Sequence, residues 1–174
     1  MESAILLCVP DAEPLVHGWR EKGDPSAAHG VPAHVTLLYP FLPRERIDAG
    51  VLGELEWFFS GIDAFPLRFG RVGRFEHAGI VFLAPESDTL VELTRAITRR
   101  WPECPPYAGQ IPAGEVVPHL TIVHSEDRGL RQSAGNAVSA RLPLRTTAVQ
   151  AALWVCDDDG DWTELATFPF GPPE

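Results

Sequence analysis

The sequence contains few cysteines, with only three in 174 residues, at Cys8, Cys104 and Cys156. Their wide spacing and odd number argue against a disulfide framework and against a zinc knuckle. Cysteines that stay reduced are typical of cytosolic proteins. We therefore expect a cytoplasmic protein whose thiols are structural.

Long hydrophobic runs are also missing. The apolar run from Ala4 to Val9 is too short for a membrane helix, which needs about 20 apolar residues, and it lacks the basic flank of a secretory signal. A chain of 174 residues is long enough to bury a substantial core in one unit. We expect residues 1–174 to form a single domain with no membrane segment.

Positive charge is scarce as well. The chain has 14 lysines and arginines against 24 acidic residues, which gives a formal net charge of −10 at pH 7. Broad, non-specific binding of nucleic acid requires a surface that neutralises phosphates, and this composition argues against it. A small basic pocket that binds the end of a nucleotide remains compatible with an acidic molecule.

One short pattern occurs twice. His34-Val35-Thr36-Leu37 is followed 85 residues later by His119-Leu120-Thr121-Ile122. Residues i and i+2 of a strand point to the same face, so each segment presents an imidazole and a hydroxyl on one side. The aliphatic residues at the alternate positions then face a core.

A second pattern repeats in the same order. Phe65-Pro66-Leu67-Arg68 follows the first motif, and Leu142-Pro143-Leu144-Arg145 follows the second. The chain thus contains an internal duplication of about 80 residues, too few copies for a solenoid. It predicts an α+β fold of two lobes related by a pseudo-two-fold axis, with antiparallel sheets lining a central cleft and helices on the outer faces. In that arrangement His34 and His119 face each other across the cleft.

The elements expected between the motifs follow from apolar periodicity, helix caps and turn residues. Strands are expected over 4–9, 33–41, 65–75, 80–83, 119–124, 142–155 and 162–168, with the last two forming a hairpin, and a tail after 168. Helices are expected over about 14–22, 44–61, 88–100 and 128–140, and irregular loops over 23–32 and 102–117.

Three segments resemble the 2H phosphoesterase superfamily, in the branch named after 2′-5′ RNA ligases. They are His34 to Phe41 (His-Val-Thr-Leu-Leu-Tyr-Pro-Phe), Pro118 to Ile122 (Pro-His-Leu-Thr-Ile), and the Pro-Pro-Tyr-Ala-Gly loop at 105–109. The resemblance implies two lobes with both motifs lining a groove. It also implies metal-independent hydrolysis of cyclic phosphodiesters and, in some members, reversible 2′-5′ joining of RNA ends.

The two histidines suit this chemistry because an unperturbed imidazole pKa near ~6.5 makes both protonation states accessible at neutral pH. We hypothesise His119 as the base and His34 as the acid in hydrolysis, carried over from the family, although the residues alone also permit the reverse. Thr36 and Thr121 are expected to donate hydrogen bonds to non-bridging phosphate oxygens.

Other interpretations of these histidines are structural imidazoles or a zinc site, which lacks a third ligand at usable spacing. A groove that binds a nucleotide or RNA end without turning it over is the competing class of function. Hydrolysis and ligation would use the same residues. The acidic composition favours a small ligand. We expect a small nucleotide or an RNA terminus as substrate, a monomeric protein, and no cofactor.

Three further residues are candidate substrate contacts. Arg68 and Arg145 occupy equivalent positions in the repeat and would flank the phosphate. Tyr107, in the loop before the second motif, would stack on a base. The alternatives are solvation at strand edges for the arginines and plain packing for Tyr107.

Overall fold

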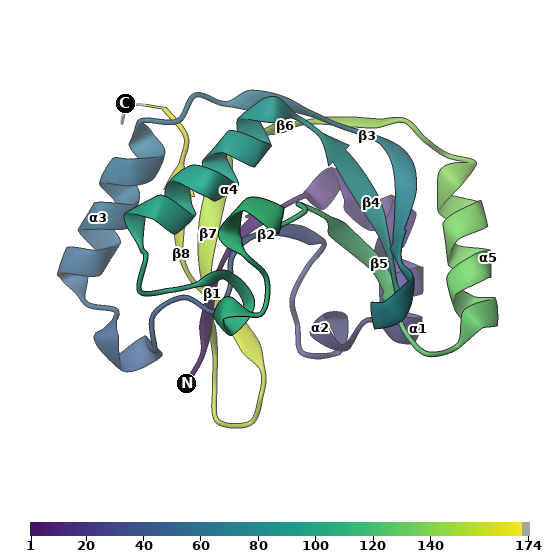
Figure 1. Cartoon of the computed structure of the whole chain (residues 1–174), viewed down its shortest axis with the longest axis horizontal. Coiled ribbons are helices and arrows are strands. Elements are labelled where there is room, and N and C mark those ends of the chain that lie inside the picture. Colours follow the sequence, from purple (N-terminus) through teal and green to yellow (C-terminus); the bar gives the residue numbers. More distant parts are fainter. Residues whose placement is uncertain (172–174) are drawn as a thin grey trace.

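A computed structural model describes residues 1–171 of the chain. Its eight strands form one antiparallel sheet in the order β6-β3-β4-β5-β2-β1-β7-β8, with helices against it (Figure 1). The strands are β1 (Ser3–Cys8), β2 (His34–Leu38), β3 (Phe65–Phe75), β4 (Ile80–Glu86), β5 (Leu120–His124), β6 (Leu144–Ala148), β7 (Gln150–Cys156) and β8 (Trp162–Pro169). The helices are α1 (Glu13–Gly23), α2 (Pro25–Ala28), α3 (Ala49–Ser60), α4 (Asp88–Arg100) and α5 (Arg128–Ser139). The predicted α+β class is confirmed.

The three longer outer helices begin at side chains that cap their first turn. The carboxylate of Asp48 accepts a hydrogen bond from the N–H of Val51, and Ser87 and Asp127 cap α4 and α5 in the same way. The prediction of a helix from residue 44 was therefore wrong at its start. Only a 3-10 turn (Arg44–Arg46) precedes the cap of α3, while α2 occupies part of the predicted loop over 23–32.

The duplication is visible in the topology. The order β1-α1-β2-α3-β3 recurs as β4-α4-β5-α5-β6, and β2 and β5 lie at the centre of the sheet. Two cross-strand pairs join equivalent positions of the two copies, namely Val35 with Leu120 and Arg68 with Arg145. A rotation that exchanges the two halves also exchanges the two members of each pair. The pseudo-two-fold axis therefore passes between Val35 and Leu120, and between Arg68 and Arg145.

The predicted strand over 142–155 is two strands. β6 pairs with β3, whereas β7 pairs with β1 and β8, and Val149 between them is exposed. One half of this segment therefore belongs to each lobe, which curls the sheet. The predicted hairpin is confirmed only for β7 and β8. Residues 172–174 of the predicted tail lie outside the described residues.

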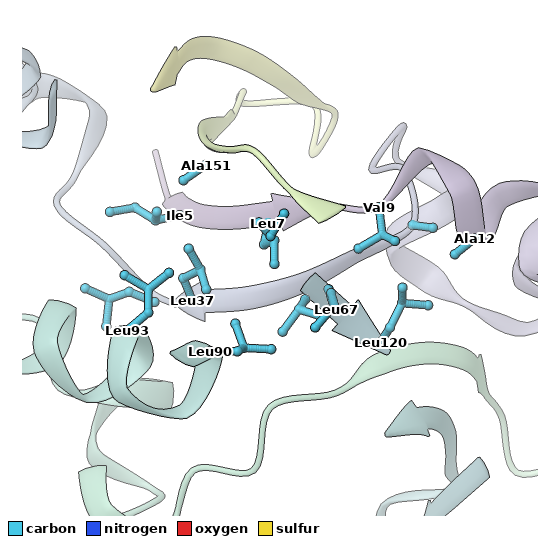
Figure 2. Packing of buried hydrophobic residues seen from close by; sticks show 14 of the residues in the cluster. Ile5, Leu7, Val9, Ala12, Leu37, Leu67, Leu90, Leu93, Leu120 and Ala151 are labelled. Atoms are coloured by element: carbon cyan, nitrogen blue, oxygen red, sulfur yellow. The ribbon is translucent and has the colours of Figure 1, made fainter. Parts of the chain in front are cut away.

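Each motif strand is packed by a helix from the other half. Helix α1 lies against β5, and α4 lies against β2. Figure 2 shows Leu37 of β2 beside Leu90 and Leu93 of α4, in a cluster that also contains Leu120. The aliphatic positions of the motifs thus belong to one shared core, and the two halves interlock.

Gly73 on β3 is required by the packing of Phe82. A Cβ added at Gly73 would lie 2.4 Å from ring atoms Cε2 and Cζ of Phe82, which is closer than carbon atoms can approach. We expect Gly73→Ala to lower the free energy of unfolding by about 1–3 kcal/mol, measured by urea denaturation. Gly53→Ala on α3 is the control, because no atom lies within 4 Å of its added Cβ and alanine favours helix. An unchanged stability of Gly73→Ala would contradict this packing.

Candidate active site

The two motif strands meet at a single backbone pair, Val35 with Leu120. From there β2 continues along β1 and β5 continues along β4, so the strands splay apart. Val35 and Leu120 hold the same position in the two motifs, so His34 and Thr36 flank one member of this pair and His119 and Thr121 flank the other. Alternation along each strand puts the imidazole and the hydroxyl of each motif on the same face.

The burial pattern shows which face these side chains occupy. Val35 and Leu120 are fully buried in the core, whereas His34, His119 and both motif threonines are half-buried. The structure thus brings the four predicted residues together on the face of the sheet opposite the main core.

Both imidazoles are oriented by the same local hydrogen bond. Nδ1 of His34 lies 2.7 Å from the carbonyl oxygen of Pro32, and Nδ1 of His119 lies 2.8 Å from that of Val117. A carbonyl oxygen only accepts, so Nδ1 carries the hydrogen and donates it. In the neutral imidazole this leaves the lone pair on Nε2, which is the atom available for proton transfer.

The site lowers the pKa of both histidines. Burial is the main cause and lowers the pKa of His34 to about 4, with the bond to Pro32 opposing it and the charge of Arg20 adding to it. Burial also lowers the pKa of His119, against the effect of its bond to Val117. Both imidazoles are therefore neutral in the free protein at neutral pH.

A buried ion pair lies near His34. Nε of Arg20 donates to the carboxylate of Asp24 at 2.8 Å, and the same carboxylate accepts from the N–H and hydroxyl of Ser26. Arg20 and Asp24 are almost completely buried, so each needs the other to offset the loss of water. This network fixes the turn that leads towards β2, and sequence reasoning missed it.

Aromatic rings surround His119 instead. The rings of Phe75 and Phe82 each meet the imidazole edge-on. Their centroids lie 5.1 Å and 5.5 Å from the centroid of the His119 ring. The two phenyl rings stack on each other at 4.3 Å. Sequence analysis did not single out these residues, because only the pairing of β4 with β5, which sets Phe82 against Thr121, brings them to the site.

Tyr107 lies beside the first motif. It lines a small cavity with Thr36 and Tyr39, and its backbone N–H donates to the carbonyl of Tyr39 at 2.6 Å. Tyr107 and Ala108 both have left-handed backbone, with φ of 50° and 55°, a conformation that non-glycine residues adopt at a cost. Burial raises the pKa of the Tyr107 phenol. Stacking of Tyr107 on a base stays a prediction.

The backbones of the two candidate arginines lie opposite each other on β3 and β6, two strands that do not carry the histidines. Arg68 lies opposite Arg145 in the β3–β6 register and forms an ion pair with Glu86. Strand β4 separates β3 from β5. Over residues 1–171, neither guanidinium forms a hydrogen bond with His34 or His119. Their contact with substrate stays a prediction.

Two further observations concern metals and membranes. Within the described part of the chain, no three histidine, cysteine, aspartate or glutamate side chains are grouped so that they could hold a metal ion. Among the helices of residues 1–171, none has the length and apolar character needed to cross a bilayer.

Comparisons with known proteins agree on one family. The sequence profile of the 2′-5′ RNA ligase superfamily matches residues 9–160. A protein of Halalkalibacterium halodurans, whose name assigns it provisionally to the phosphoesterases, is 28% identical over 165 residues, covering 92% of this chain and 91% of that protein.

Two solved structures share the fold. The crystal structure of TT0787 of Thermus thermophilus superposes with a TM-score of 0.65 at 19% identity, covering 100% of both chains. That of E. coli LigT complexed with 3′-AMP superposes with a TM-score of 0.65 at 17% identity, covering 97% of each chain.

The lowered pKa of His34 predicts a specific dependence of stability on pH. Between its unfolded value of 6.5 and about 4, the unfolded chain binds more protons than the folded one, so the free energy of unfolding falls as pH falls. We expect a loss of roughly 1–3 kcal/mol over this window. Urea denaturation at several pH values should show most of this loss abolished in His34→Gln and retained in His77→Gln, at an exposed turn. An identical pH dependence in wild type and His34→Gln would contradict the burial of a neutral His34.

Proposed function

Because the chain belongs to the 2′-5′ RNA ligase superfamily, we propose that it is a phosphoesterase that hydrolyses 2′,3′-cyclic phosphates of nucleotides or RNA ends. The observation that carries the proposal is the junction of β2 and β5. The backbone pair of Val35 with Leu120 lies between the two histidine–threonine pairs, and the bond of each Nδ1 to a carbonyl oxygen leaves Nε2 as the acceptor, which supports a role for both imidazoles in proton transfer. E. coli LigT has been crystallised with 3′-AMP, ATP and NADP+, which supports a nucleotide as ligand.

In the proposed reaction the base, His119, removes a proton from water through Nε2. The resulting hydroxide attacks phosphorus in line with the ribose oxygen on the opposite side. As that P–O bond breaks, protonated His34 donates its proton to the leaving oxygen, so the products are a phosphomonoester and a free ribose hydroxyl. Thr36 and Thr121 donate to the non-bridging oxygens, where negative charge develops.

The proton on the acid comes with substrate binding. Burial keeps His34 neutral in the free protein, with its pKa near 4. The negative charge of a bound phosphate favours the protonated imidazole and raises that pKa again. The bound phosphate therefore favours the protonated form of His34 that its role as acid requires.

The three other candidate substrate contacts are part of the same proposal. Tyr107, next to Thr36, would stack on the base of the bound nucleotide. Arg68 and Arg145 would contribute positive charge further along the sheet, with Glu86 neutralising part of the charge of Arg68.

The proposal predicts turnover of 2′,3′-cyclic mononucleotides in the presence of EDTA. We expect His34→Ala and His119→Ala each to lose at least 100-fold in kcat, in the usual range for removing an acid or base. The rate should depend on pH as a bell, because one histidine must be neutral and the other protonated. His17→Ala, on the exposed side of α1, is the control and should keep full activity.

Two outcomes would contradict this function. If the protein binds nucleotides but hydrolyses none of the four 2′,3′-cyclic mononucleotides, it is a binding module instead. Loss of activity in EDTA alone would require a metal. Formation of 2′-5′ linkages from RNA ends, assayed with the same variants, distinguishes ligation from hydrolysis as the main activity.

A further inference from the structure

Strands β3 and β4 form a wall beside His119, and their pairing determines which side chains belong to it. Phe82 of β4 pairs with Thr121 of β5 on one side and with Gly73 of β3 on the other. A Cβ added at Gly73 would lie 2.4 Å from the Phe82 ring, so Gly73 and that ring are on the same face of the sheet. The Phe82 ring in turn meets the imidazole of His119. Gly73 therefore marks the catalytic face of β3.

Arg71 lies on this face of β3. Side chains two residues apart in a strand point the same way, so Arg71 faces the same side as Gly73. Val72 between them packs against the main core on the other face. Arg71 pairs with Ala84, which is two residues from Phe82 on β4 and therefore on the same face as the Phe82 ring. The backbone thus places an arginine in the wall that borders the histidine site, and sequence analysis did not single it out.

The positive charge of Arg71 is available to a ligand. Arg71 is exposed, and the arginine ion pairs within residues 1–171 involve positions 20, 68, 95 and 100 but not 71. Arg20 is neutralised by Asp24, and Arg68 by Glu86. In a chain with a net charge of −10, an anionic substrate gains from an uncompensated cation beside the site.

Arg71 is also better placed than the two arginines predicted from the sequence. Only β4 separates β3 from β5, and neighbouring strands lie about 4.8 Å apart, so the backbones of β3 and β5 are about 10 Å apart. An extended arginine side chain covers much of that distance, and a phosphate at Nε2 of His119 covers the rest. Arg68 pairs with Glu86, further along β4 from the Phe82 pair, and Arg145 lies on β6 beyond β3.

We propose that Arg71 is a further substrate-binding residue, whose guanidinium donates to the non-bridging oxygens of the phosphate at His34 and His119. The inference rests on the proposed function and adds a residue to the same site. A planar guanidinium matches a pair of phosphate oxygens, and its hydrogen bonds are strengthened by charge. Neutral histidines and threonine hydroxyls supply donors and acceptors but no net charge. Arg71 supplies the positive charge that offsets the phosphate.

The test compares two arginines on opposite faces of one strand. Arg74 of β3 is exposed as well, but it packs against α5, where a Cβ added at Gly135 would lie 2.7 Å from its Nη2. We expect Arg71→Gln to lower kcat/KM for 2′,3′-cyclic mononucleotides about 10- to 100-fold, as for the loss of a hydrogen bond to a charged group. Arg74→Gln removes the same charge from the other face and should leave kcat/KM unchanged. Arg71→Lys keeps the charge without the planar fork and should restore part of the loss.

Binding of 3′-AMP, measured by titration calorimetry, separates this inference from the proposed function because it needs no turnover. We expect Arg71→Gln to raise the Kd at least about 10-fold and Arg74→Gln to leave it unchanged. Weaker binding in Arg71→Gln, together with a wild type that turns over no cyclic nucleotide, would support this contact and contradict the proposed function.

Three results would overturn the role of Arg71. One is the same Kd and kcat/KM in wild type and Arg71→Gln. Another is an equal loss in Arg74→Gln, because the effect would then come from net charge rather than from a contact on the catalytic face. The third is a wild-type protein that does not bind 3′-AMP.

Discussion

A single backbone pairing, Val35 with Leu120, determines how the site is built. It is the only rung between β2 and β5 over residues 1–171, and it lies on the pseudo-two-fold axis. Because α1 of the first half covers β5 and α4 of the second half covers β2, neither motif strand is packed by its own half alone. Separating the lobes would expose core residues such as Leu37 to water. Burial of these residues therefore keeps the Val35–Leu120 pair in place.

The symmetry supplies two similar imidazoles, and the surroundings make them different. Each Nδ1 donates to the carbonyl two residues earlier, which leaves each Nε2 available. His34 lies near the buried charges of Arg20 and Asp24, whereas His119 is bordered by aromatic rings. Acid–base catalysis at one phosphorus needs two groups with different proton affinities at the same moment. Two copies of one motif in different surroundings, charged groups near His34 and aromatic rings at His119, meet this requirement.

The sequence was informative where local chemistry decides structure. Strand alternation and the two repeats predicted the lobes and the motif strands, and the helix predicted over about 88–100 is α4. The sequence was uninformative where pairing between strands that are distant in the chain determines the structure. The break at Val149 follows from one segment serving both lobes, and Phe82 reaches His119 through the β4–β5 register. The start of α3 at Asp48 was missed because residues 44–46 form a separate 3-10 turn.

The central claim is that His34 and His119 serve one phosphorus as acid and base. Its most direct measurement uses a nucleoside 3′-phosphodiester with a p-nitrophenol leaving group, which departs without a proton. The account predicts that this substrate restores much of the rate of His34→Ala and little of that of His119→Ala. Rescue of His119→Ala alone would exchange the two roles. Equal rates of the two variants on both the activated and the ordinary substrate would contradict the assignment of His34 and His119 as acid and base at one phosphorus.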